Sequence, residues 1–460
     1  MKKINSIVTF PLLLISLISC TDDVSNLDSA IKDTNNENSK LSETEAAIQN
    51  CIVRKHGLSR SETMTMLPYI LEGDTVMYIV NYSTGWEIYA NDIHMPMIVM
   101  QSEVGNFYPT EITFEESPLL EVLNRAANTI REVKRNELDV KDAPDSTWTP
   151  YLPKATYATS GERHLVAQGW EDNEYIYTPK SGRLITKWCQ DKGFKQFTRQ
   201  LYNSSGELQN ALVGCGPVAV GQYLYWYHKH FGTPKSFPAR AELYGNQYKF
   251  YGESTDWDAI FTDNSDYVIT EYEKMKPTAL FLGNIADNMK VSFGLESTGS
   301  DKHNILNEII RQTSVDHTYD YCTSDKVIKW LSQGYPLVAF GDIIKNNEPD
   351  GHAYIIDYCR VETYSSLCYW AYVDKPVGDD EDEDPLAEYD NPTLEQVKEV
   401  YGDDVQVTKS TTSRLWVMIN WGWRNDNLDT AELYYNYLVN SYSQVENIKV
   451  ANPTIVYPEL

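Results

Sequence analysis

Residues 213–222 read VGCGPVAVGQ, and the interpretation of the chain begins with this stretch. Pro217 suits the first turn of a helix and Gly232 suits its end, so a helix is expected over 211–231. Cys215 then lies at the positive end of that helix, where the macrodipole and the unpaired N–H groups favour thiolate over thiol. A buried structural cysteine is the competing interpretation, because free cysteine is among the most buried residue types.

His352 is the candidate general base for such a thiolate. Residues 336–341 and 351–357 predict two strands of a hairpin, with His352 at the entrance of the second strand, where a loop opens to solvent. An imidazole within hydrogen-bond distance would take the thiol proton and later protonate a leaving amine. A lone histidine is more often structural than catalytic, but the chain has only eight and this one follows a glycine.

Other segments supply groups that a Cys-His pair needs. A third residue must hold the imidazole in one orientation and tautomer, and Asn420, near the end of the strand expected over 415–421, is predicted to accept its ring N–H. Trp421 is predicted to shield that bond from water, and burial of its ring as ordinary core is compatible with this role. Gln190 and the backbone N–H of Cys215 are predicted to donate to a developing oxyanion.

The first residues have the layout of an export signal. Two lysines precede an apolar run over 7–18 that is too short to span a bilayer. Leu-Ile-Ser directly before Cys20 resembles a bacterial lipoprotein signal, and an ordinary signal peptide with an incidental cysteine is the alternative. We therefore expect a signal peptide over 1–19 and a flexible tether over 20–44, with a lipid on Cys20 that anchors an exported protein to the outer membrane or cell surface.

Length, charge and cysteine spacing limit the classes of function. A chain of 460 residues exceeds what one hydrophobic core usually fills, so two or more folding units are expected. The formal net charge of -27 argues against nucleic acid as a partner. The seven cysteines show no CxxC spacing, so no metal, redox site or cofactor is expected. Export permits disulfides, and Cys359 is expected to pair with Cys368 on a neighbouring strand.

After the tether the sequence divides into two units. Residues 45–150 contain three short β-rich runs and a charged amphipathic helix over 119–140, which predict a small α+β domain. Residues 151–181 are expected to be a linker. The unit over 182–460 has helical patterns first and strand patterns later, which predicts a second α+β domain.

Several of these motifs together are shared with a known family. Gly214-Cys215 and the following helix, residues 351–357, and Asn420-Trp421-Gly422-Trp423 resemble the streptopain family of papain-like cysteine peptidases, and the order Gln, Cys, His, Asn-Trp agrees. Residues 78–107 are similar to the pro-domain of that family. The resemblance implies an α+β fold in which a papain-like two-lobed peptidase domain is preceded by a small α+β pro-domain.

The resemblance also implies roles for the candidate residues. Cys215 would be the nucleophile, His352 the base and acid, Gln190 the oxyanion donor, and Asn420 with Trp421 the orienting group. The implied protein is a cysteine endopeptidase made as a zymogen, which hydrolyses peptides or proteins through a thioester. Its own pro-domain would act as an intramolecular inhibitor until a cut in the linker activates and releases the enzyme.

Three features depart from the family pattern. Gly216-Pro217 replaces the commonest residues after the nucleophile, Arg424-Asn425-Asp426-Asn427 lacks the usual glycines, and an acidic run over 379–384 lies in a long insertion. The acidic run fits a solvated loop better than a calcium site. Two alternatives therefore stay open: an inactive surface lipoprotein that acts as a binding or inhibitor protein, and another Cys-His acyl transferase such as an amidase or a transglutaminase-like enzyme.

Overall fold

The chain folds into helices and antiparallel strands, which confirms the predicted α+β class. The computed structural model describes residues 42–56, 64–82, 85–108, 118–138, 145, 147–148, 151, 164–178, 182–235, 238, 240–252, 254–262, 272–345, 348–372, 386, 389, 391–422, 432–434 and 454–458.

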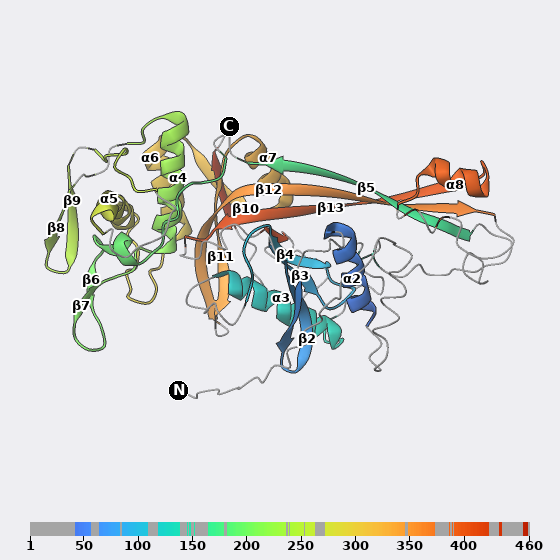
Figure 1. Ribbon diagram of the computed structural model, residues 1–460. Helices are drawn as coiled ribbons and strands as arrows, with labels where there is room; N and C mark the ends of the chain where they lie inside the picture. Colours follow the sequence, from blue (N-terminus) through green and yellow to red (C-terminus); the bar gives the residue numbers. More distant parts are fainter. Residues whose placement is uncertain are drawn as a thin grey trace.

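One long antiparallel sheet runs through the molecule (Figure 1). Its strands follow the order β1-β2-β3-β4-β14-β13-β12-β11-β15-β10, and β5 pairs with β12 beyond the end of β11. Their bounds are β1 Thr65–Leu71, β2 Asp74–Asn81, β3 Trp86–Ala90, β4 Ile98–Ser102, β5 His164–Tyr177, β10 His317–Tyr321, β11 Leu337–Lys345, β12 Glu348–Ala371, β13 Gln406–Asn420, β14 Glu432–Tyr434 and β15 Thr454–Pro458.

A helical lobe covers one face of β11 and β12. Helix α4 (Cys215–Phe231) lies at its centre and is apolar on nearly every side, so its first three turns are buried. Val338 of β11 and Ala353 and Ile355 of β12 belong to the same core. The other elements of the lobe are α5 Tyr272–Asn288, α6 Lys302–Thr313, the 3₁₀ turn η2 Lys192–Lys195, and the hairpins β6–β7 (Gln200–Tyr202, Leu208–Asn210) and β8–β9 (Arg240–Tyr244, Gln247–Tyr251).

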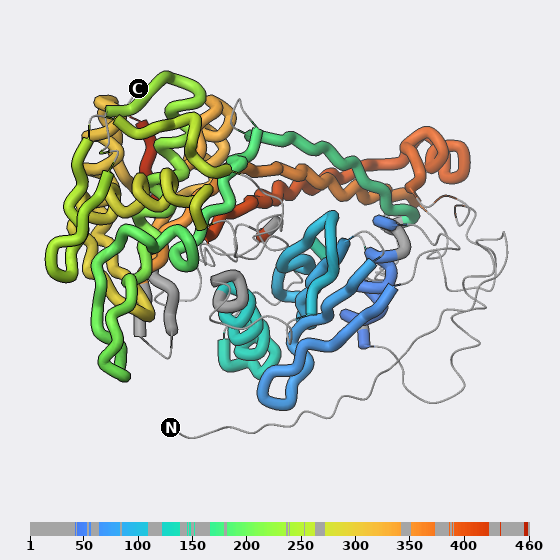
Figure 2. Tube along the Cα trace, turned by 60° about the vertical axis from the view of Figure 1, so that its left-hand side comes forward, coloured from blue at the N-terminus to red at the C-terminus, as the bar shows by residue number. Residues whose placement is uncertain are grey.

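An N-terminal unit supplies four strands at one edge of the sheet, and one of its helices packs on the face of β11 and β12 opposite to α4. It consists of α2 (Glu43–His56), β1 to β4 and α3 (Pro118–Lys134), and Figure 2 shows it beneath the long strands. Buried residues of α3 and of α7 (Ser324–Ser332) share one core with Tyr354 and Ile356 of β12. Side chains alternate along a strand, so β12 supplies one residue set to the helical lobe and the other to this core.

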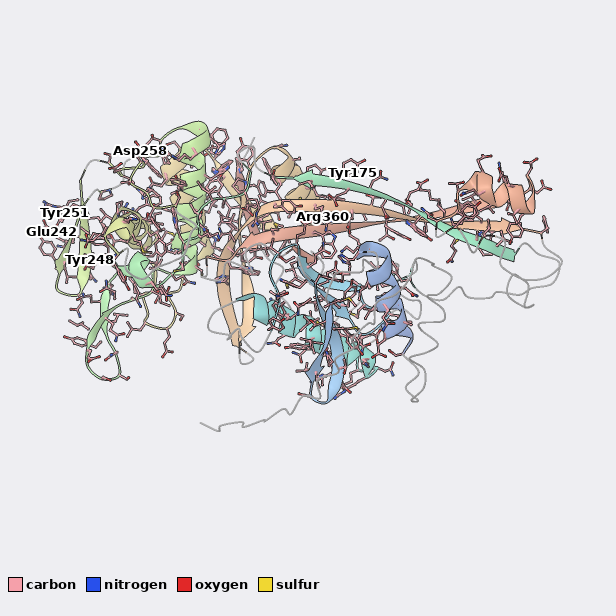
Figure 3. The ribbon with its side chains drawn as sticks, in the orientation of Figure 1. Tyr175, Glu242, Tyr248, Tyr251, Asp258 and Arg360 are labelled. Atoms are coloured by element: carbon pink, nitrogen blue, oxygen red, sulfur yellow. The ribbon has the colours of Figure 1, made fainter. Side chains whose placement is uncertain are left out.

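Three strands extend beyond both units as an arm (Figures 1 and 2). The outer parts of β12 and β13 pair with each other, and β5 pairs with β12 along the same stretch. Figure 3 labels Tyr175 on β5 and Arg360 on β12, and the Arg360 guanidinium lies 2.9 Å from the Glu174 carboxylate. At the tip, α8 (Leu394–Tyr401) covers a small separate core.

The arm corrects two expectations. Residues 164–177 fall within the predicted linker but form β5, whose partner strand is far along the chain and leaves no local signal. The expected pairing of Cys359 with Cys368 is wrong, because both lie on the continuous strand β12 and are free thiols. An extended chain of this length separates their Cα atoms by about 30 Å, whereas a disulfide needs less than about 7 Å.

Several sequence features lie outside the described residues. These are the predicted signal peptide, the lipid site Cys20, most of the tether, the acidic run over 379–384, and residues 423–427. None of the helices in the described ranges combines the length and apolar character needed to cross a bilayer. The proposed division into pro-domain and peptidase domain remains a prediction.

Candidate functional site

The chain reaches α4, Cys215–Phe231, through a turn that backbone hydrogen bonds hold on two sides. Gly214, the residue before the helix, has a φ of 97° that favours glycine, and Cys215 is the first helical residue. The Val213 N–H donates to the Gln190 carbonyl at 2.9 Å, and the Leu212 N–H donates to the Gly294 carbonyl at 2.9 Å. Sequence reasoning therefore placed Cys215 correctly at a helix N-terminus, where the side chain is buried.

Close packing explains both glycines that flank the cysteine. A Cβ at Gly214 would lie 2.9 Å from Thr298 Cγ2, and one at Gly216 would lie 2.5 Å from Ser300 Oγ. Thr298 Oγ1 also donates to the Leu212 carbonyl at 2.8 Å. Gly216, one of the departures from the streptopain pattern, is thus a requirement of the loop that packs on this helix start.

His352 is buried near the beginning of β12. Its Nε2 lies 3.1 Å from the Trp421 carbonyl oxygen, so the ring donates its Nε2 proton there. Its ring also stacks against those of Trp421 and Tyr354, with centroids 6.1 and 6.2 Å away. In the neutral ring this tautomer places the basic lone pair on Nδ1, the nitrogen that a general base would use.

Burial decides the charge of this imidazole. It lowers the pKa of His352 to about 4, against the opposing effect of the Trp421 carbonyl. The ring is therefore neutral at neutral pH in the full chain. A neutral ring can accept a proton, but an imidazolium paired with a thiolate would require a higher pKa than this environment gives.

Asn420 has a different partner from the one predicted. Its Oδ1 accepts from Gln222 Nε2 at 3.0 Å and from the Gly422 N–H at 3.2 Å. Its Nδ2 donates to the Thr186 carbonyl at 2.8 Å. The carbonyl of Trp421, rather than the side chain of Asn420, accepts the imidazole N–H. The prediction that Asn420 binds the ring directly is wrong, because its side chain faces α4.

The turn after β13 connects the two reactive candidates. Cys215, Val218 and Gln222 lie three and four residues apart along α4, so they share one face of the helix. Gln222 binds Asn420, and a Cβ on Gly422 would lie 2.9 Å from Val218 Cγ1. The face of α4 that begins with Cys215 therefore docks on the turn whose carbonyl binds His352. Sequence reasoning missed Gln222, although its helical spacing from Cys215 was a visible signal.

The N-terminal unit reaches the surroundings of His352. Tyr354 and Trp421, the two rings stacked on the imidazole, share a core with buried residues of α3. The Arg125 guanidinium of α3 lies close enough to Tyr354 to act on the pKa of that phenol, which burial raises. The apolar cover that keeps His352 neutral is thus built partly from this unit.

Gln190 lies beside the nucleophile loop. Its carbonyl binds the Val213 N–H, which aligns residue 190 with the segment that leads into Cys215. Its neighbours are fixed as well, since Trp188 Nε1 donates to the Phe261 carbonyl at 2.8 Å. The predicted role of the Gln190 amide as an oxyanion donor stays a prediction.

The solved structures that resemble this chain include two of interpain A. No protein-family model and no curated protein matches the sequence. A fragment of prointerpain A from Prevotella intermedia, with a cysteine-to-alanine substitution, has a TM-score of 0.48 and 17% identity, covering 86% of this chain and 98% of that chain. The active wild-type interpain A cysteine protease from Prevotella intermedia has a TM-score of 0.36 and 16% identity, covering 61% of this chain and 94% of that chain.

Proposed function

We propose that this chain is a papain-like cysteine endopeptidase of the streptopain type, made as a zymogen. The Cys215 thiol gives its proton to Nδ1 of His352, and the sulfur attacks the carbonyl carbon of a peptide bond. The Cys215 N–H and the Gln190 amide hold the resulting oxyanion. The imidazolium then protonates the leaving amine, and water hydrolyses the thioester with His352 as base.

One observation carries this proposal. The turn at Trp421 and Gly422 contacts the α4 face that begins with Cys215, and the same turn fixes the His352 tautomer through the Trp421 carbonyl. A cysteine that served only as core would need neither a positive-φ glycine before it nor an oriented imidazole on the adjoining turn. This arrangement supports acyl transfer by a Cys-His pair.

The N-terminal unit is proposed to be the intramolecular inhibitor. It contributes to the core around Tyr354 and Trp421, and in that environment burial holds the pKa of His352 near 4. Loss of the unit would let water reach these rings and would raise the His352 pKa toward its ordinary value. A thiolate-imidazolium pair would then become accessible at neutral pH.

Labelling with an irreversible thiol-directed peptidase probe tests the activity. A recognition sequence for a specific protease, inserted between Tyr151 and His164, allows the folded full chain to be cut on demand. We expect the probe to label the cut chain and not the uncut chain. Cys215→Ala should abolish labelling, whereas Cys189→Ala, a matched change at another buried cysteine of the same lobe, should preserve it.

The burial of Cys215 and His352 in the full chain favours a second candidate, an inactive surface protein that binds or inhibits others. Absence of labelling in the C-terminal part, after a complete cut and separation from the N-terminal unit, would favour this candidate. Incubation with a peptide library distinguishes a peptidase from the further alternative, another Cys-His acyl transferase. A peptidase shortens the peptides, while an amidase or transglutaminase-like enzyme changes only their side chains.

Cys20 is proposed to carry the lipid that holds the protein at the outer membrane or cell surface. The sequence before it supports this proposal. Detergent phase partition of the protein from a bacterial host should place the wild type in the detergent phase and Cys20→Ser in the aqueous phase. Cutting between Tyr151 and His164 should release the C-terminal part, and a wild type that partitions into water would contradict the anchor.

A further inference from the structure

A buried polar network joins α4 to the end of β13. Gln222 is fully buried and its Nε2 donates to Asn420 Oδ1 at 3.0 Å and to the Thr186 carbonyl at 3.3 Å. Asn420 Nδ2 donates to the same carbonyl at 2.8 Å, and Asn420 Oδ1 accepts the Gly422 N–H at 3.2 Å. Each hydrogen-bonding atom of the Asn420 amide is therefore engaged, so its orientation is fixed.

The network ends at the imidazole. The bond between Asn420 Oδ1 and the Gly422 N–H closes the turn around Trp421, whose carbonyl accepts the His352 Nε2 proton. A reversed Asn420 amide would place its NH₂ group against the Gly422 N–H and its oxygen against the Thr186 carbonyl. Gln222, as a donor to Oδ1, opposes that reversal and so holds the Trp421 carbonyl toward the ring.

Stability alone does not explain a glutamine at this position. The Gln222 Oε1 atom is buried without a hydrogen-bond partner among the described residues. A buried acceptor without a partner costs free energy that an apolar side chain of similar size would avoid. The donor nitrogen of Gln222 is therefore the feature that distinguishes it from a core residue.

We propose that Gln222 is a positioning residue for the reaction, acting through Asn420 and the Trp421 carbonyl on the orientation and tautomer of His352. This inference rests on the proposed peptidase function. It assigns Asn420 an indirect role, since it orients the turn and the turn orients the imidazole. The Gln222 amide touches neither substrate nor sulfur in this scheme.

Variants of Gln222 in the full chain, cut at the inserted site, test the role. Gln222→Met keeps the volume and removes the donor, and we expect it to lower kcat by about 10²-fold with a small effect on KM. Gln222→Glu donates only while protonated, and its acceptor neighbours and burial favour that form. Its kcat should therefore match the wild type near pH 5.5 and fall to the Gln222→Met value near pH 8.5.

Gln312→Met is the matched control. Gln312 is a buried glutamine of α6 whose Oε1 likewise has no partner among the described residues, and it contacts Glu308 rather than the Asn420 turn. Its variant should keep the wild-type pH profile even if the melting temperature changes. Two results would overturn the positioning role. One is a Gln222→Met variant with the kcat and pH profile of the wild type. The other is a Gln222→Glu variant whose pH profile is identical to that of Gln222→Met.

Amide hydrogen exchange in the uncut chain tests the network apart from activity. Gln222→Met should speed exchange of the Gly422 amide at least tenfold, and Gln312→Met should leave it unchanged. Equal protection of that amide in wild type and Gln222→Met contradicts the inference. If no form of the chain hydrolyses peptides while this exchange changes as expected, the proposed function fails and the positioning network stands.

Discussion

The ionisation of His352 links the stability of the chain to pH. Burial lowers its pKa from the ordinary 6.5 to about 4, so between these values the unfolded chain binds a proton that the folded chain does not. The free energy of unfolding should therefore fall on acidification from about pH 6.5 to about pH 4, by on the order of 3 kcal/mol from this group. Urea denaturation of the full chain at several pH values measures this loss.

The matched variant is His352→Phe, which keeps a ring against Trp421 and Tyr354 and cannot titrate. It is expected to be less stable at neutral pH, since the Trp421 carbonyl loses its donor, but to show a flatter dependence on pH. His94→Phe, in the N-terminal unit, serves as the control for general histidine effects. Equal pH dependence in wild type and His352→Phe would show that the imidazole is not held neutral.

The glycine before the nucleophile gives a second prediction at this scale. Gly214 combines a φ of 97° with a Cβ position 2.9 Å from Thr298, so Gly214→Ala adds backbone strain and a clash. At Gly206 the φ is 79° and no atom lies within 4 Å of the Cβ position, so an alanine there adds backbone strain without a clash. We expect Gly206→Ala to cost about 1 kcal/mol and Gly214→Ala about 3 kcal/mol, measured by urea denaturation. Equal costs would show that the Thr298 contact is easily relieved.

Local signals predicted part of the site and could not predict the rest. The position of Cys215 follows from a helix start, and that of His352 from a strand entrance, which are both local features. The acceptor for the imidazole is a backbone carbonyl, and every residue has one, so no side chain in the sequence marks it. The partner of Asn420 depends on which face of β13 meets α4, and only the packed sheet determines that.

At the scale of elements, a buried charge cluster ties α2 to β3. The buried Glu87 carboxylate accepts from Lys55, His56 and Tyr82, and Lys55 also donates to Gln101 at 2.8 Å. Burial alone would raise the pKa of Glu87, but Lys55 and these hydrogen bonds hold it well below its ordinary value. The cluster therefore stabilises the unit at neutral pH and loses that contribution only as the pH falls below about 4.5.

Glu87→Gln is expected to destabilise the N-terminal unit by about 3–5 kcal/mol, because it leaves the Lys55 ammonium partly buried without its counter-charge. Hydrogen exchange of α2 and β3 locates the effect within the unit. Glu72→Gln is the matched control, since the Glu72 carboxylate that pairs with Arg131 is exposed and its loss should cost less than about 1 kcal/mol. A similar loss in both variants would mean that burial does not strengthen the cluster.

The length of an element could be predicted from the sequence only where one hydrophobic period, helical or strand-like, continued along the whole element. The helices predicted over 119–140 and 211–231 correspond to α3 and α4, with ends that differ by up to six residues. The strand predicted over 351–357 and the neighbouring strand expected to hold Cys368 both belong to β12, because the polar residues between them resemble a turn but do not form one. Those residues are buried or half-buried along the arm, where two neighbouring strands satisfy the backbone and Arg360 pairs with Glu174 and Glu362, so their polarity does not mark a break in the strand.

At the scale of the whole molecule, the sheet is shared between the two halves of the chain. Strand β14 pairs with β4 of the N-terminal unit and with β13 of the C-terminal part, and β5 pairs with β12. A cut before β5 therefore leaves this strand within the C-terminal part, bound along the arm. Removal of the N-terminal unit must instead break the short pairing between β4 and β14 and open the core around Tyr354 and Trp421.

That opening leads to a prediction for the cut chain. Trp416, Trp421 and Tyr354 are almost fully buried in the core shared with α3, so departure of the N-terminal unit would expose a contiguous apolar face. We expect a hydrophobic dye to bind the separated C-terminal part strongly, and the uncut chain and the cut but associated chain weakly. Ala126→Glu, on the buried side of α3, should speed separation after the cut, whereas Asn128→Glu, on the half-exposed side, should not. Separation without dye binding would mean that other segments of the chain cover this face as the N-terminal unit departs.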